Sequence, residues 1–295
     1  ANAVDGIEVN SNLTTTTGAL SLDGDSDSAV DTLSGNDNII FGSGVTLTSA
    51  GNISLSALTG EITTTGDLTL SGASNITMTG AMSGTGDISL SASNGITLNN
   101  DISTTSGTLN INANSSTLTL ASGVALSSAG AMTLSAGNTT SSGNLTLTST
   151  GSTISLNNAL VSAGTVTMSA STGLTLSNST LTGAGNISLQ GGSALSLASG
   201  MNITSSAGNI TLAGSSITAN NGALTLSSNG SITVSNSLSS VGAVTMTANS
   251  GITLASSVTA SGVVDLDADL DNNGTGDFTL SSGSLSTSNN ALTVT

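Results

Sequence analysis

The side chains of this chain best suited to bind a ligand are carboxylates, and they gather in two short stretches. The first has the pattern D-x-D-x-D-x-x-x-D and comprises Asp23, Asp25, Asp27 and Asp31. The second keeps the same spacing and comprises Asp269, Asp271, Asn273 and Asp277. Oxygen ligands at positions one, three, five and nine of a loop are those that Ca²⁺ takes in proteins. The spacing therefore predicts Ca²⁺ as a bound cofactor in both stretches.

Both patterns lack part of a full calcium-binding loop. The twelfth position supplies a bidentate acid in an EF-hand, but here it is Ser34 in the first stretch and Leu280 in the second. An acidic, solvated loop that keeps the protein soluble is the alternative. The absence of Lys and Arg favours the cation, because close carboxylates without a basic partner either recruit cations or repel each other. The run Asn36-Asp37-Asn38 is a further candidate source of a ligand at the first site.

Another pair of carboxylates raises the question of catalysis. Asp67 and Asp87 precede equivalent strands one coil apart, and two carboxylates at about that separation are the arrangement of a retaining glycosidase. The same position in other repeats carries an amide, at Asn52, Asn144, Asn186 and Asn209. We therefore interpret it as a turn position that prefers Asp or Asn, and not as a catalytic pair.

The composition excludes several classes of function. The 295 residues include no Lys, Arg, His, Cys, Pro, Trp or Tyr, and 16 acidic residues give a formal net charge of −16. Without basic side chains the chain cannot neutralise phosphates, so we expect neither nucleic acid nor an anionic membrane surface as a partner. Without His, Ser/His/Asp catalysis is impossible, and no apolar run approaches the ~18 residues of a membrane helix. We expect no enzyme and no direct membrane insertion.

Apolar residues recur at a regular spacing that sets the fold class. The pattern apolar–Ser/Thr–apolar appears throughout the chain, as in Ile88-Ser89-Leu90. Two evenly spaced sets show the period, namely Leu145, Val166 and Ile187 in the first and Leu224, Val244 and Val264 in the second. A fixed period in this range indicates stacked repeats, and the alternation indicates strands with one buried face. The sequence predicts an all-β parallel β-helix, or β-solenoid, with about 20–21 residues and two to three strands per coil.

Each coil is expected to turn at Gly and Asn, which tolerate positive φ, and to present its Ser and Thr side chains to solvent. Two spacings are shorter than a coil, from Met132 to Leu145 and from Ile210 to Leu224; they predict coils that lose a face or bulge. We predict one continuous solenoid over residues 1–295, with acidic loop insertions near 22–38 and 265–277.

The two ends of the sequence resemble each other. Residues 20–27 (LSLDGDSD) match residues 264–271 (VDLDADLD). Further on, Gly44, Ile53 and Leu55 match Gly283, Leu292 and Val294 at a constant offset of 239. A second period of about 240 residues is therefore present. Neither end resembles the polar cap that keeps a solenoid soluble; the alternative is a short cap that is not recognisable from the sequence. We expect the solenoid to continue, in a longer tandem chain or by stacking of identical subunits.

The repeats also carry a family resemblance. The runs 51–57 (GNISLSA), 94–98 (NGITL) and 267–280 (DADLDNNGTGDFTL) resemble the large bacterial filamentous-haemagglutinin-like and β-strand-repeat surface proteins. The resemblance covers essentially the whole chain. It implies a right-handed β-helix that is exported and forms long stalks or fibres for adhesion, matrices or sheaths. The chain differs from haemagglutinin-type proteins in lacking every basic and nearly every aromatic residue.

Together these features predict a structural protein, secreted or at the cell surface. We expect a fibre or stalk subunit or segment (filament, matrix, sheath or adhesin rod) that stacks its β-strands end to end with identical subunits or adjacent repeats of the same chain. The alternative is a cell-surface adhesin module that binds glycan or cations on one face. A β-helical polysaccharide-processing enzyme is disfavoured, because such families use Arg or Lys and often aromatic sugar platforms.

Overall fold

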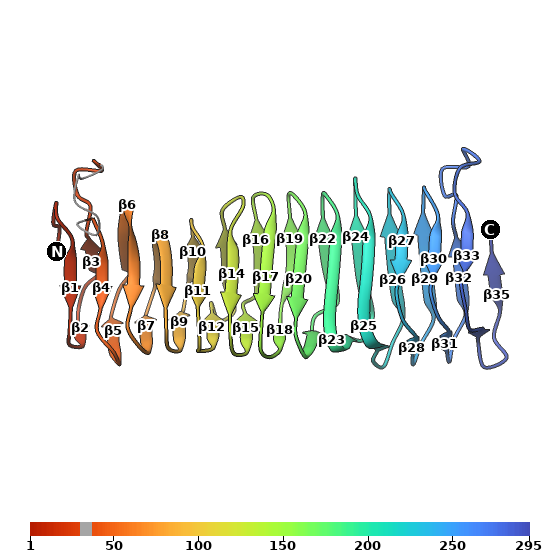
Figure 1. Ribbon diagram of the computed structural model, residues 1–295, viewed down its shortest axis with the longest axis horizontal. Helices are drawn as coiled ribbons and strands as arrows, with labels where there is room; N and C mark the ends of the chain where they lie inside the picture. The colour runs from red at the N-terminus through yellow and green to blue at the C-terminus, as the bar shows by residue number, and fades with distance from the viewer. Residues whose placement is uncertain (30–36) are drawn as a thin grey trace. The chain divides into compact units, whose positions relative to one another are not determined.

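The computed structural model describes residues 1–29 and 37–295. Every regular element among them is a β-strand, 35 in all, and the strands wind into parallel coils stacked about 21 residues apart. The predicted all-β solenoid is thus confirmed. The chain forms two compact units, and Figure 1 labels strands of both. Unit 1 comprises residues 1–141 and 148–151, and unit 2 comprises residues 142–147 and 152–295.

The strands of unit 1 alternate buried apolar residues with outward hydroxyls. They are β1 (Ile7–Val9), β2 (Leu13–Thr15), β3 (Leu20–Asp23), β4 (Ile39–Phe41), β5 (Val45–Ser49), β6 (Ile53–Thr64), β7 (Leu68–Gly72), β8 (Asn75–Gly84), β9 (Ile88–Ala92), β10 (Gly95–Leu98), β11 (Ile102–Thr104), β12 (Leu109–Asn112), β13 (Thr117–Leu120), β14 (Ala125–Ser128), β15 (Met132–Ser135) and β16 (Asn138–Ser141). In β9, Ile88 and Leu90 are buried while Ser89 is half-buried, which is the period of two that a strand imposes.

Parallel pairing sorts these strands into three ladders, one on each face of the coil. One ladder runs β3–β6–β8–β10–β13–β16, and the next runs β1–β4–β6–β8–β11–β14. The third runs β2–β5–β7–β9–β12–β15. Because β6 and β8 continue around a corner, each of them belongs to two ladders.

Unit 2 repeats this architecture. Its strands are β18 (Ile154–Leu156), β19 (Ala159–Ser162), β20 (Val166–Ala170), β21 (Gly173–Leu176), β22 (Thr180–Gly183), β23 (Ile187–Leu197), β24 (Met201–Ser205), β25 (Ile210–Ala219), β26 (Leu224–Ser228), β27 (Ile232–Val234), β28 (Leu238–Ser240), β29 (Val244–Ala248), β30 (Ile252–Leu254), β31 (Val258–Ala260), β32 (Val264–Asp267), β33 (Phe278–Leu280), β34 (Leu285–Ser286) and β35 (Leu292–Val294), and β17 (Leu145–Ser149) has residues in both units. Here the strands that round a corner are β23 and β25, which each pair in two ladders.

The register confirms the predicted period. Val166 pairs with Ile187, and Val244 pairs with both Leu224 and Val264. These side chains are fully buried, so like residues stack on like residues from coil to coil. The interior is a narrow aliphatic column, in which each buried side chain contributes about 1.5–3 kcal/mol before chain entropy is subtracted.

The predicted loss of a face at the two short spacings is wrong. Ile210 lies in β25 and pairs with Ile187 and Ile232, whereas Leu224 lies in β26, in a different ladder. Likewise, β16 stands between β15, which holds Met132, and β17, which holds Leu145. Each short spacing therefore joins two faces of the winding chain, because all faces carry the same apolar–hydroxyl–apolar tripeptide.

The two acidic insertions are visible as longer steps between paired strands. Ile7 pairs with Ile39 and Ile252 pairs with Phe278, and both steps exceed the ordinary coil spacing of about 21 residues. The extra residues lie between β3 and β4 in unit 1 and between β32 and β33 in unit 2. The positions agree with the predicted insertions near 22–38 and 265–277.

Candidate functional site

The first acidic loop, between β3 and β4, uses two carboxylates on its own backbone. Asp23 Oδ1 accepts a hydrogen bond from the Asp25 N–H at 3.2 Å, and Asp27 Oδ1 accepts one from the Ala29 N–H at 3.2 Å. Asp23 is half-buried and Asp27 is exposed. Asp31, the fourth ligand predicted here, lies outside the described residues. Asp23 and Asp27 therefore shape the turn.

Asp25 behaves differently, because its side chain is buried. Only 2 % of the residue is exposed. Its Oδ2 accepts hydrogen bonds from the N–H and the Oγ1 of Thr59, at 2.7 and 2.9 Å; Thr59 lies in β6, which pairs with β3. Its Oδ1 is buried and has no hydrogen-bond partner among the described residues. A buried acceptor of this kind costs free energy unless something positive reaches it.

Asp37 reaches the same threonine from the other end of the loop. It is 7 % exposed, and its Oδ2 lies 2.9 Å from Thr59 Oγ1. The carbonyl oxygen of Ala29 lies 3.2 Å from the same Oγ1. A hydroxyl carries one hydrogen, so Thr59 Oγ1 donates to only one of these three oxygens, while the Thr59 N–H serves Asp25 Oδ2. The loop thus gathers two carboxylates, a carbonyl and a hydroxyl at one point.

The second acidic loop, between β32 and β33, closes on its own amides. The Asp269 carboxylate accepts hydrogen bonds from the N–H groups of Asn273 and Gly274, at 3.1 and 2.8 Å. Asp271 Oδ2 accepts one from Asn273 Nδ2 at 2.9 Å. Asp271, Asn273 and Asp277 are exposed. In this loop three of the predicted ligands, Asp269, Asp271 and Asn273, make a hydrogen-bonded turn.

A shared backbone turn shows how the two loops correspond. Ser28, with φ +55°, donates its N–H to the Asp25 carbonyl at 3.2 Å, and Asn272, with φ +53°, donates its N–H to the Asp269 carbonyl at 2.8 Å. Asp25 is therefore the counterpart of Asp269, as the match between residues 20–27 and 264–271 predicts. The calcium spacing instead aligns Asp23 with Asp269, so the two predicted sites are not structurally equivalent.

No group of three or more acidic side chains is placed to hold one metal ion in residues 1–29 and 37–295. Binding of Ca²⁺ by all eight predicted residues therefore stays a prediction. What the structure brings together is a smaller set, Asp25 with Asp37 at Thr59. The sequence pattern included Asp25, and the run 36–38, which contains Asp37, was a candidate source of a further ligand. The sequence did not indicate Thr59, which is 34 residues from Asp25 along the chain.

The interpretation of Asp67 and Asp87 as turn residues is confirmed. Asp67 Oδ1 accepts a hydrogen bond from the Asp87 N–H at 2.9 Å, and Asp87 Oδ1 accepts one from the Thr108 N–H at 2.7 Å. Asn186 does the same for the Asn209 N–H at 2.8 Å. Each side-chain oxygen caps the equivalent backbone N–H one coil further on. A carboxylate or an amide oxygen serves equally in such a turn. The expectation that all these residues share one position is wrong, because Asp67 and Asp87 precede strands of the ladder that reaches β23 at Leu195, whereas Asn186 and Asn209 precede Ile187 and Ile210 of another ladder.

Buried hydroxyls at the corners were missed by the expectation that Ser and Thr face solvent. They are Ser49, Thr64, Thr104, Ser128, Ser141, Ser149, Ser162, Ser205, Ser228 and Ser240. Ser228 is representative: its Oγ donates to the Gly208 carbonyl at 2.7 Å and accepts from the Gly230 N–H at 3.1 Å. Each of these residues stands two or three positions before a Gly, and this spacing is the sequence signal that would have identified them.

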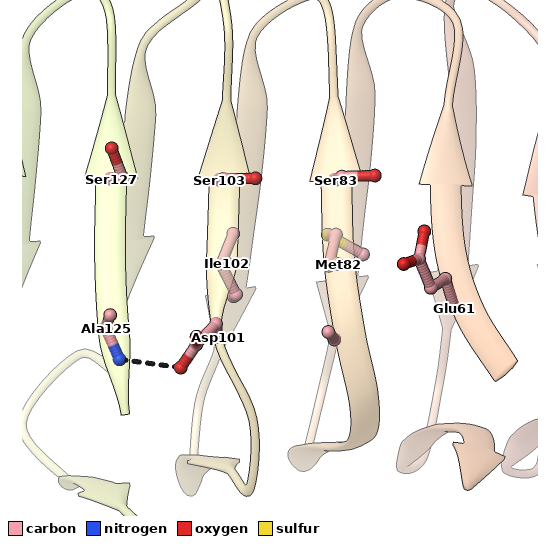
Figure 2. Close-up of a pocket in the computed structure, with 9 residues that line it drawn as sticks. Glu61, Met82, Ser83, Asp101, Ile102, Ser103, Ala125 and Ser127 are labelled. Atoms are coloured by element: carbon pink, nitrogen blue, oxygen red, sulfur yellow. Dashed lines mark hydrogen bonds between the residues drawn. The ribbon is translucent and has the colours of Figure 1, made fainter. Parts of the chain in front are cut away.

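A shallow hollow of about 300 Å³ lies on the outer surface of unit 1, across β6, β8, β11 and β14. Figure 2 shows the hydroxyls of Ser83, Ser103 and Ser127 in a row along its rim, in register from coil to coil. Glu61 and Asp101 add carboxylates, and Asp101 Oδ1 accepts a hydrogen bond from the Ala125 N–H at 2.8 Å. The hollow offers hydrogen-bonding groups to a polar ligand.

The described residues contain no helix long and apolar enough to cross a lipid bilayer. The solenoid fold does not by itself identify a family, so the likeness to bacterial surface proteins stays a hypothesis. Comparisons of the chain with protein-family models, with curated proteins and with solved structures gave no match.

Proposed function

We propose that this chain is a structural segment of an extracellular fibre or stalk, in which coils add end to end by β-strand pairing. The observation that carries the proposal is the outer edge of β35. Leu292 and Val294 pair in register with the buried Val264 and Leu266, yet they are 48 % and 43 % exposed. An apolar row on a strand with a free edge is a template for another strand.

The outer edge of unit 1 has the same character. Ile7 in β1 and Leu13 in β2 pair with Ile39 and Leu47 on one side and remain half-buried. A hollow of about 280 Å³ opens beside them, and its lining is mainly apolar. The partner that fits both edges is a further coil of the same kind, from a second copy or from an adjacent repeat. A parallel coil would satisfy the strand N–H and C=O groups and cover the apolar row together.

The remaining surface supports the same proposal. Between the buried positions the strands present Ser and Thr, and the formal charge of −16 has no basic counterpart in the side chains. The acidic residues lie within residues 5–101 and 265–277, with none between these stretches, so like-charge repulsion opposes sideways aggregation of those stretches only. The edges with exposed apolar rows favour axial association. The extracellular location rests on the resemblance to exported surface proteins.

The test is the oligomeric state of two matched variants. Val294→Asp places a charge in the apolar row, and Thr293→Asp places the same charge on the outward face of the same strand. Light scattering after size exclusion, over a hundredfold range of concentration, should show end-to-end association of the wild type and of Thr293→Asp, and a monomer for Val294→Asp. A wild type that stays monomeric throughout, or a Val294→Asp variant that associates equally well, would overturn the proposal.

The hollow in Figure 2 favours one alternative, a module that binds a glycan on one face. Its row of serine hydroxyls and its two carboxylates, from Glu61 and Asp101, suit hydrogen bonding to a sugar. A glycan panel probed with the monomeric Val294→Asp variant tests this idea. Specific binding that is lost upon Ser103→Ala would favour the module, and an absence of binding would remove it.

A further inference from the structure

We infer that Asp25, Asp37 and Thr59 form a Ca²⁺ site that ties the first acidic loop to β6. The inference starts from hydrogen-bond counting. Oxygens of Asp25 and Asp37 each lie 2.9 Å from Thr59 Oγ1, and the Ala29 carbonyl oxygen lies 3.2 Å from it. The single hydroxyl hydrogen reaches one of them. The hydroxyl therefore cannot offset the charge of both carboxylates.

No side chain of this protein supplies a positive charge there. The sequence contains no Lys, Arg or His, and the N-terminal ammonium of Ala1 donates instead to the Ser21 carbonyl at 2.7 Å. Yet Asp25 and Asp37 are 2 % and 7 % exposed. One oxygen of each carboxylate lies 2.9 Å from Thr59 Oγ1. These two carboxylate oxygens therefore cannot be farther apart than twice that distance. Buried carboxylates this close repel each other unless a proton or a cation lies between them.

The orphaned oxygen of Asp25 points to a ligand independently of this cluster of charge. Asp25 Oδ1 is buried and receives no hydrogen bond from any described residue, although Oδ2 of the same group accepts from the Thr59 N–H and lies 2.9 Å from Thr59 Oγ1. Buried carboxylate oxygens are ordinarily hydrogen-bonded or metal-bound. A cation that coordinates Oδ1 would satisfy the acceptor that the fold leaves open.

The chemistry of the donors selects Ca²⁺ among common cations. The candidate ligands are carboxylate, carbonyl and hydroxyl oxygens, with no nitrogen or sulfur, so Zn²⁺ is disfavoured. They come from a loop and from the next coil, in an irregular arrangement. Ca²⁺ accepts six to eight oxygens in flexible geometry, whereas Mg²⁺ demands a near-ideal octahedron and keeps most of its water. Two carboxylates indicate a site of modest affinity.

The backbone around the site is built for a close approach. The Ser26 N–H donates to the Ala3 carbonyl at 2.9 Å, which holds the loop beside Asp25. On the other side, a Cβ at Gly60 would lie 2.3 Å from the Asp37 carbonyl oxygen, so only glycine lets Asp37 come this near to β6. A cation here would therefore lock both ends of the insertion onto the coil.

Isothermal titration calorimetry with CaCl₂, on the whole chain at pH 7, tests the inference together with thermal melts in Ca²⁺ and in EDTA. Asp25→Asn and Asp37→Asn remove one charge each at the site. Asp27→Asn, in the same loop, and Asp269→Asn, at the equivalent position of the second loop, are matched controls. We expect Ca²⁺ to raise the melting temperature of the wild type and of both controls, and Mg²⁺ to have little effect. In Asp25→Asn and Asp37→Asn the affinity should fall at least about tenfold, since ligand charge sets Ca²⁺ affinity.

Three outcomes would overturn the inference. The first is a wild type that shows no Ca²⁺-dependent heat or melting shift. The second is Ca²⁺ binding that survives Asp25→Asn and Asp37→Asn unchanged, which would move any cation elsewhere. The third is a melting temperature that is insensitive to Ca²⁺ but rises on acidification in the wild type and not in Asp25→Asn, which would show a shared proton instead. If an Asn variant fails to fold, Thr59→Val, which removes the hydroxyl at similar volume, serves in its place and should also weaken Ca²⁺ binding.

Discussion

At the scale of single residues, the corners of the coils depend on a few buried hydroxyls. Ser228 is 1 % exposed and bonds one glycine carbonyl of the preceding coil and the N–H of Gly230. Ser228→Ala removes the hydroxyl that links the two groups, while the Gly230 N–H keeps the Gly208 carbonyl as an acceptor at 3.1 Å, so we expect the free energy of unfolding to fall by about 1 kcal/mol. Thr225→Ala, on the outward face of the same strand, should lower the free energy of unfolding by only a few tenths of a kcal/mol. Denaturant unfolding of both variants checks this, and equal losses would contradict it.

Single residues also show which features could be predicted from the sequence and which could not. Alternation in β9 predicts which side chains are buried, because the strand period leaves no choice. The meeting of Asp25 with Asp37 at Thr59 has no such signal. It depends on how a loop insertion folds back onto a strand of the next coil, and the spacing of acidic residues describes only the loop. The turn position of Asp67 and Asp87 could be predicted, since a local preference decides it.

At the scale of elements, the strands that round a corner depend on glycine. In β8, Gly80 has φ +116°, and a Cβ there would lie 2.5 Å from the Ala57 carbonyl oxygen. Gly80→Ala should therefore cost about 3 kcal/mol or more, from backbone strain and a steric clash together. Gly123 also has a positive φ, of +84°, but nothing lies within 4 Å of its Cβ position. Gly123→Ala should cost about 1 kcal/mol from strain alone.

Melting curves of the two glycine variants separate clash from strain. A Gly80→Ala protein as stable as Gly123→Ala would mean that the corner of β8 relaxes freely. The elements themselves were predictable, because apolar residues that recur once per coil define successive members of one ladder. The sequence could not predict to which face a given tripeptide belongs, because all three faces share one pattern. For this reason the spacing between Ile210 and Leu224 predicted a shortened coil, although the two residues lie on different faces of the solenoid.

At the scale of the whole molecule, solubility should depend on pH in an unusual way. The side chains carry 16 acidic groups and no basic group. Carboxyl groups ordinarily take up protons between about pH 5 and pH 3, so over this range the negative net charge falls towards zero. Below pH 3 the net charge of most proteins becomes strongly positive, but that of this chain does not, because it has no basic side chain. Solubility should therefore decrease near pH 4 and should not recover at pH 2. Turbidity measured from pH 7 to pH 2 checks this, and a recovery at pH 2 would contradict it.

A fibre requires that the outer edges of β33–β35 and of β1 and β2 accept a further coil; residues 1–3 already pair with the outer edge of β3. Electron cryomicroscopy of concentrated wild-type protein would show this contact itself. We expect filaments in which strands stack along the axis at about 4.8 Å, with β35 of one copy paired to the first coil of the next and Leu292 and Val294 covered. Discrete particles with both edges open, or filaments joined through their flanks, would refute end-to-end stacking.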